Sequence, residues 1–119
     1  MAVRGVRGAT TVENNTFEEV SQAVLEIMAE IEQKNQIDPR DIVSAMFSVT
    51  PDLDAVFPAK IARSRPHWEH VPLMDVQHMY VPGDLEKCIR ILLQVNTNRS
   101  QTQIQHIYLH RAKCLRPDL

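Results

Sequence analysis

The stretch Thr16–Asn35, TFEEVSQAVLEIMAEIEQKN, contains the one long helix that this chain predicts. It begins with a capping pattern, in which the hydroxyl of Thr16 is followed three positions later by Glu19. Apolar residues then recur at helical spacing, at Phe17, Val20, Val24, Ile27, Met28 and Ile31. Glutamates occupy the other faces, so we expect an amphipathic helix that buries a single apolar stripe.

The segments outside this helix are rich in β-branched and other apolar residues, which is typical of strands. We predict strands over residues 2–8, 42–49, 71–76, 88–95 and 104–109. The first should end in a turn at Gly8, and Pro72 indicates an edge position for the third. Residues 59–65 predict one or two helical turns, residues 81–84 predict a turn, and the tail 114–119 should be extended because Pro117 disfavours helix before it.

These elements predict an α+β fold with a five-stranded mixed sheet, one long helix and short helical turns. A chain of 119 residues corresponds to a single domain over residues 1–119. One helix can cover only one face of such a sheet, so an apolar second face favours oligomerisation. A domain of this size also has little room for a deep private pocket, which favours a ligand site shared with another subunit.

The composition is that of a globular protein, with 44% hydrophobic and 24% charged residues. A formal net charge of −2 argues against a nucleic-acid partner, which usually requires a basic excess. Nine of the 13 basic residues are arginines, which suit bidentate contacts to carboxylate or phosphate. If their segments converge, they predict a small anionic ligand, and ordinary surface ion pairs are the alternative. The arginines at issue are Arg4, Arg7, Arg63, Arg65, Arg90, Arg111 and Arg116.

The chain shows no signal-peptide pattern and no apolar run long enough for a membrane span. Its two cysteines, Cys88 and Cys114, are 26 positions apart and lack the pattern of a disulfide scaffold or a metal site. We therefore expect a cytoplasmic protein. The histidines do not form a convincing set of metal ligands, so no metal site is expected.

Three arginine positions restrict where a ligand could bind. On a strand, Arg4 and Arg7 are separated by an odd step, so at most one of them can face a given site. Arg90 lies inside the apolar stretch 88–95, and a buried guanidinium needs an anionic partner. That partner is either an internal acidic side chain or a ligand, and the sequence alone leaves both possibilities open.

Five segments spread over nearly the whole chain match one family in the same order. They are Arg4–Thr11 (RGVRGATT), Thr50–Lys60 (TPDLDAVFPAK), Val81–Gly83 (VPG), Cys88–Arg90 (CIR) and Leu115–Leu119 (LRPDL). Together they resemble the small monofunctional bacterial chorismate mutases. The resemblance implies a homotrimer that forms a pseudo-α/β-barrel, with sites between neighbouring subunits.

The resemblance also implies an activity, the rearrangement of chorismate to prephenate in phenylalanine and tyrosine biosynthesis. This intramolecular [3,3] shift uses no cofactor, metal or nucleophile. It can be accelerated by holding the flexible dianion in its reactive conformer and by placing fixed charge where the transition state becomes polar. An anion-binding protein with weakened activity and a trimeric enamine or imine deaminase are the alternatives.

The resemblance further implies the residues of the site. Arg90 is the expected cation at the ether oxygen, where negative charge develops as the C–O bond breaks. Arg7 and Tyr108 should bind a carboxylate, and Phe57 should pack on the ring. The full set of implied substrate-binding residues is Arg7, Phe57, Lys60, Arg63, Met74, Tyr108, Leu115 and Arg116.

Two positions depart from the family pattern. The family usually has Glu where this chain has His78, and a small neutral residue where it has Asp75. We therefore expect Asp75 to take over the contact to the substrate hydroxyl and the negative charge facing the ring. A neutral His78 could instead accept a hydrogen bond, but it would supply no charge.

Overall fold

Five strands form one mixed sheet in the computed structural model, which describes residues 1–116. The elements are β1 (Ala2–Thr11), α1 (Phe17–Asn35), β2 (Ile42–Val49), α2 (Pro58–Arg63), β3 (Leu73–Gln77), β4 (Cys88–Thr97) and β5 (Ile107–Tyr108), with short 3-10 helices at Pro39–Asp41, Gln101–Gln103 and His110–Leu115. The strand order is β3-β2-β4-β1-β5. Strand β4 is antiparallel to β1 and β2, whereas the two edge strands β3 and β5 pair in parallel. The predicted sheet and long helix are confirmed.

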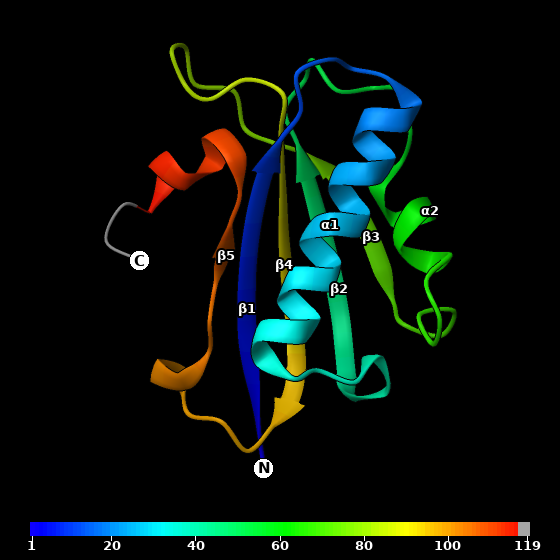
Figure 1. Ribbon diagram of the computed structural model, residues 1–119, viewed down its shortest axis with the longest axis vertical. Coiled ribbons are helices and arrows are strands. Elements are labelled where there is room, and N and C mark those ends of the chain that lie inside the picture. Colours follow the sequence, from blue (N-terminus) through cyan, green and yellow to red (C-terminus); the bar gives the residue numbers. More distant parts are fainter. Residues whose placement is uncertain (117–119) are drawn as a thin grey trace.

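Helix α1 lies across one face of this sheet, with α2 beside it (Figure 1). The hydroxyl of Thr16 accepts from the Glu19 N–H at 3.1 Å, which confirms the predicted cap. The predicted apolar stripe faces the sheet and is fully buried except at Phe17, which is 53% exposed at the start of the helix. No helix among the described residues is long and apolar enough to cross a bilayer.

Strand β1 does not turn at Gly8, as the sequence predicted, but continues to Thr11. The glycine is needed for packing, because α1 crosses β1 closely at this point. A Cβ at Gly8 would lie 2.9 Å from Ile31 Cδ1 and 3.0 Å from Ile91 Cγ2. The missing side chain therefore allows α1 to approach the sheet.

Gly8→Ala is expected to lower the free energy of unfolding by about 1–3 kcal/mol, because the added methyl group overpacks the α1–sheet contact. Gly5→Ala is the matched control on the same strand, since a Cβ there would meet only Leu92 Cδ1 at 3.8 Å. Urea unfolding followed by circular dichroism measures both. Equal stabilities of the two variants would contradict this account of Gly8.

Other predicted elements form in the structure with different first or last residues. Strand β3 starts directly after Pro72 and lies at an edge, as predicted. The last predicted strand, 104–109, is reduced to Ile107–Tyr108. The tail is not extended at its beginning, because His110–Leu115 forms a 3-10 helix. Residues 117–119, which include the end of the LRPDL segment, lie outside the described residues.

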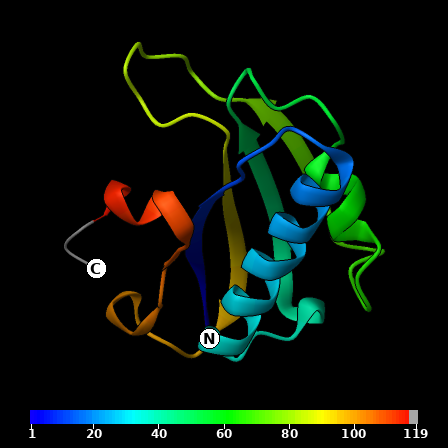
Figure 2. The same cartoon turned by 45° about the horizontal axis from the view of Figure 1, so that its top comes forward.

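The last 3-10 helix, His110–Leu115, lies on the other side of the sheet from α2 in the turned view of Figure 2, and it covers part of the face opposite α1. Near β5, Ala112 of the last 3-10 helix packs on Ala9 and Cys88, with Leu85, Tyr108 and Leu115 around them. Elsewhere this face exposes apolar side chains in one row of the register, from Leu92 through Met46 to Met74. We call these three residues the apolar row.

Candidate active site

Strand register places the predicted cation beside the predicted hydroxyl on the face away from α1. Arg90 of β4 pairs with Ala9 of β1, and Ala9 pairs in turn with Tyr108 of β5. On its other side Arg90 pairs with Ser48 of β2. Because paired residues point to the same face of a sheet, Arg90 and Tyr108 are separated only by the small side chain of Ala9.

Both side chains are half-buried, and each has a buried polar atom that is left without a partner. The Arg90 side chain is 20% exposed, and its Nη2 lies 3.5 Å from Asp84 Oδ2. Its Nε and the hydroxyl of Tyr108 have no hydrogen-bond partner among residues 1–116. Buried polar groups are normally hydrogen-bonded, and a buried group without a partner lowers the stability of the fold. The two groups can therefore donate hydrogen bonds to oxygen atoms of a molecule outside this protomer.

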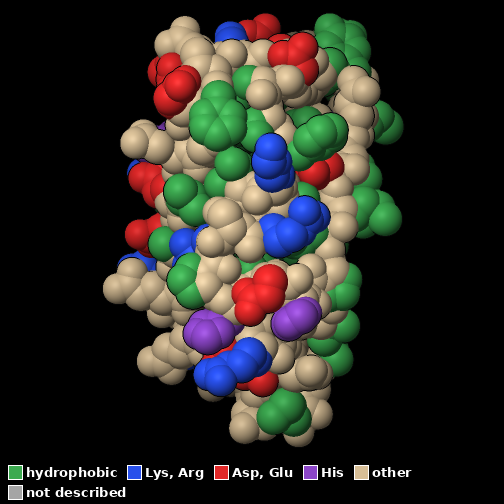
Figure 3. Space-filling view, turned by 90° about the vertical axis from the view of Figure 1, so that its right-hand side faces the viewer, with side chains coloured by type: hydrophobic (Ala, Val, Ile, Leu, Met, Phe, Trp, Pro, Cys, Tyr) green, Lys and Arg blue, Asp and Glu red, His purple; other side chains and the backbone are tan. Residues whose placement is uncertain are grey.

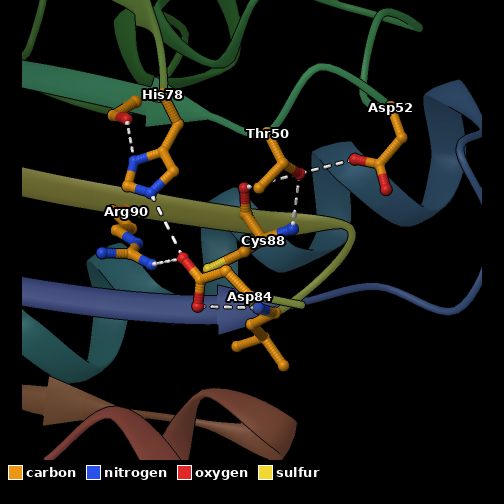
Figure 4. A network of polar contacts seen from close by, with 8 residues as sticks. Thr50, Asp52, His78, Asp84, Cys88 and Arg90 are labelled. Atoms are coloured by element: carbon orange, nitrogen blue, oxygen red, sulfur yellow. Dashed lines mark hydrogen bonds and ion pairs between the residues drawn. The ribbon is translucent and has the colours of Figure 1, made fainter. Parts of the chain in front are cut away.

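His78 lies next to Arg90 as part of the same polar network (Figure 4). Its Nδ1 is 3.1 Å from Ser48 Oγ, and its Nε2 is 3.8 Å from Asp84 Oδ2. Asp84 was not among the residues that the sequence predicted for the site. Its only signal was its place in the predicted 81–84 turn, which the Asp84 N–H to Val81 O bond of 3.1 Å confirms.

Burial also controls the protonation of a thiol in this network. Cys88, two positions before Arg90 on β4, is 1% exposed. Burial raises the pKa of the Cys88 thiol, although a hydrogen bond and the positive charge of Arg90 act in the opposite direction. The thiol therefore stays neutral and leaves the charge of Arg90 uncompensated on that side.

Three more predicted residues lie near Tyr108. Arg7 is on the same face of β1, and its backbone N–H donates to His106 Nδ1 at 3.0 Å. Burial lowers the pKa of His106, and the charges of Arg116 and Arg7 lower it further. Leu115 packs with Tyr108 against the same small cluster. The β5 side of the sheet thus combines cationic groups with a neutral imidazole.

The remaining predicted contacts lie at the opposite edge of the sheet, on β3, on α2 and in the segment that leads into α2. Phe57 is 70% exposed and, with Lys60, lines a cavity of about 500 Å³. Arg63 ends α2, and Met74 is exposed on β3. Figure 3 views this side of the molecule and shows basic side chains lying among apolar ones. Strands β3 and β5 are four strand spacings apart, roughly 19 Å, so one protomer does not bring the two groups together.

The structure does not place Asp75 with Arg90. The register pairs Asp75 with Phe47, so its side chain points to the face that the helices cover. There it accepts the N–H of Ala59 at 3.0 Å, in the first turn of α2. Burial raises the pKa of Asp75, although the Ala59 N–H and the charge of Arg63 lower it. Within the protomer Asp75 holds the first turn of α2, and its expected contact to the substrate hydroxyl stays a prediction.

Several other arginines have ordinary structural partners, so not all of them converge. Arg65 Nη2 pairs with Glu32 at 2.6 Å, and Arg111 Nη2 donates to the Val12 carbonyl at 3.1 Å. Arg4 donates to the Arg99 carbonyl on the helix-covered face. Arg4 and Arg7 therefore face opposite sides of the sheet, as predicted. In the part of the chain described, no three His, Cys, Asp or Glu side chains form a group that could hold a metal ion.

Comparisons with known proteins agree over the full length of the chain. The sequence profile of the family described as chorismate mutase type I matches residues 3–119. Chorismate mutase AroH of Bacillus subtilis (strain 168) is 47% identical over 119 residues, which is all of this chain and 94% of that protein. The AroH of Thermus thermophilus is 41% identical over 118 residues, covering 98% of this chain and 96% of that protein.

A solved structure agrees with this assignment. The chorismate mutase from Clostridium thermocellum superimposes with a TM-score of 0.89 at 44% identity, covering 92% of this chain and 97% of that chain. The motif order, the position of the half-buried Arg90 and the full-length matches all lead to the same result. The chain belongs to the chorismate mutase type I family.

Proposed function

We propose that this protein is an isomerase that converts chorismate to prephenate, in a site completed by a second subunit of a homotrimer. Family membership and full-length relatives named chorismate mutase support the reaction. The observation that carries the proposal is the pair of buried, unpartnered groups, Arg90 Nε and the Tyr108 hydroxyl, on one face of the sheet. Both groups can donate a hydrogen bond to an oxygen atom of a small dianion.

The proposed chemistry depends on charge and conformation. In the [3,3] shift one C–O bond breaks and one C–C bond forms within the same molecule, without an added reductant, nucleophile or cofactor. The ether oxygen becomes negative in the transition state, so Arg90 stabilises it more than the ground state. Arg7 and Tyr108 hold a carboxylate, and this restricts the substrate to its compact reactive conformer.

The separation of the two residue groups supports a shared site. Arg90 lies on the central strand β4, with Arg7 on β1 and Tyr108 on β5, whereas Phe57 and Lys60 lie beyond the β3 edge. A small substrate cannot span the roughly 19 Å between the edge strands. In a closed ring of copies, the β3 side of one subunit meets the β5 side of the next, and each site then receives both groups.

The exposed apolar row supports the trimer. Leu92, Met46 and Met74 are 41%, 41% and 57% exposed, on the face that neither α1 nor α2 covers. Packing three such faces around an axis buries the row and leaves the helices outside, which is the arrangement of a pseudo-α/β-barrel. Both cysteines are free in the protomer, which supports a reducing, cytoplasmic location. The proposed role in phenylalanine and tyrosine biosynthesis is supported by family membership and by the relatives named chorismate mutase.

The purified protein should consume chorismate, followed by its ultraviolet absorbance, and release prephenate without added metal or cofactor. Binding without turnover would instead indicate an anion-binding protein, and failure to bind or consume chorismate would exclude the proposed reaction.

Mixing two inactive variants tests whether the site is shared. Arg90→Ala and the double variant Lys60→Ala/Arg63→Ala, unfolded and refolded together in equal amounts, should recover about a quarter of wild-type activity, because random mixing leaves about one interface in four with both halves intact. Each variant refolded alone is the control. No recovery on mixing, with trimers formed, would place the whole site within one subunit.

A further inference from the structure

The turn before β4 presents a carboxylate directly to Arg90. Gly83 has φ +85, a conformation that glycine adopts readily, and the Asp84 N–H closes the turn on the Val81 carbonyl. Asp84 Oδ1 accepts the N–H of Leu85 at 2.8 Å. One carboxylate oxygen is thus tied to the backbone of its own turn, and the other, Oδ2, points toward the sheet (Figure 4).

The free oxygen of Asp84 lies between the two polar side chains of the site. Oδ2 is 3.5 Å from Arg90 Nη2 and 3.8 Å from His78 Nε2. His78 is held in turn by its N–H bond to the Val49 carbonyl at 2.7 Å and by Ser48 Oγ at 3.1 Å from Nδ1. When the serine hydroxyl donates to Nδ1, the imidazole proton lies on Nε2 and faces the carboxylate.

We propose that Asp84 is the catalytic carboxylate of this enzyme and that His78 is a positioning residue that orients it; this assignment rests on the proposed function. As the C–O bond of the substrate lengthens, the ether oxygen becomes negative and the ring becomes positive. Arg90 faces the oxygen and Asp84 faces the ring, so a fixed pair of opposite charges matches the charge separation of the transition state.

The contact geometry distinguishes this role from that of a simple counterion for Arg90. The Arg90–Asp84 contact is long for a charge-assisted hydrogen bond, which is usually about 2.7–2.9 Å. Arg90 retains an unpartnered, buried Nε, so Asp84 does not satisfy the guanidinium. Asp84 is 36% exposed on its side chain, whereas Arg90 and His78 are 20% and 19% exposed. The carboxylate therefore lies at the open side of the pair, where a ligand can reach both charges.

Asp84→Asn should lower kcat about 10- to 100-fold with KM unchanged or slightly lower. The expected KM follows from charge, because the carboxylate repels a dianionic substrate in the ground state and helps only when the ring becomes positive.

Adding His78→Glu to Asp84→Asn should restore kcat at least severalfold, because it returns a carboxylate to a position within about 4 Å of the lost one. Glu86→Gln, an exposed acid two positions along the same loop, is the matched control and should retain wild-type kcat.

Steady-state kinetics on chorismate with the unmodified protein and all four variants, including Asp75→Asn, gives a decisive result. A lower KM with wild-type kcat in Asp84→Asn would show that Asp84 is only a counterion of Arg90. An equal loss in Glu86→Gln, no recovery in the double variant, or a larger loss in Asp75→Asn would each overturn the assignment. If the unmodified protein shows no turnover, the proposed function itself fails. This result differs from the outcomes that overturn only the assignment of Asp84, in which the unmodified protein is active.

Discussion

Arg90→Ala is expected to lower kcat by about 10²–10³-fold, the largest effect predicted for a single side chain in this protein. The substitution removes the half-buried cation that lies between Ser48 and Ala9 on the open face of the sheet. The charge of Arg90 has its largest effect as the ether oxygen becomes negative, so its loss should reduce kcat more than it raises KM. Steady-state kinetics on chorismate, with circular dichroism to confirm folding, measures the effect.

Arg90→Lys separates the charge from the geometry of the guanidinium. Lysine retains the positive charge but cannot make two parallel contacts, so kcat should fall between that of the wild type and that of Arg90→Ala. Arg65→Lys is a suitable control, because Arg65 pairs with Glu32 on the helix side and has no place in the proposed site. Turnover of Arg90→Ala within tenfold of the wild type would contradict the proposed role of this residue.

Met46→Glu should convert the trimer to monomers and remove at least about 90% of the activity. Met46 is the middle residue of the apolar row, between Leu92 and Met74 in the register. Assembly would bury the new carboxylate without a partner at every subunit interface, at a cost of several kcal/mol each. Monomers would lack the second half of each site. Sedimentation velocity and chorismate turnover, measured on the same samples, test both consequences.

Leu25→Glu is the matched control for the interface variant. Leu25 is 38% exposed on α1, close to the 41% of Met46, but it lies on the helix layer, away from the proposed interface. The same apolar-to-acid change should therefore leave both assembly and turnover near wild type. A fully active monomer of Met46→Glu would refute the shared site, whereas an unchanged trimer would show that the apolar row is not the interface.

The amino-acid sequence alone determined the features that depend on local pattern. The spacing of apolar residues over Phe17–Asn35 predicted α1 and its buried stripe, because a helix repeats every 3.6 residues whatever it packs against. Pro72 predicted an edge strand, because proline cannot donate to a neighbouring strand. The odd step from Arg4 to Arg7 predicted opposite faces, and the motif order predicted the family.

The tertiary structure decided what local pattern could not. Gly8 suggested a turn, but α1 crosses β1 there, and only packing between distant segments shows why a side chain is excluded. Asp75 was expected to contact the substrate hydroxyl, and strand register directs its side chain toward α2 within the protomer, since a shift of one residue reverses the face. Asp84 approaches Arg90 only because the 81–84 turn folds back over β4. Local spacing sets the type of element, whereas long-range pairing sets which side chains meet, and the site depends on that pairing.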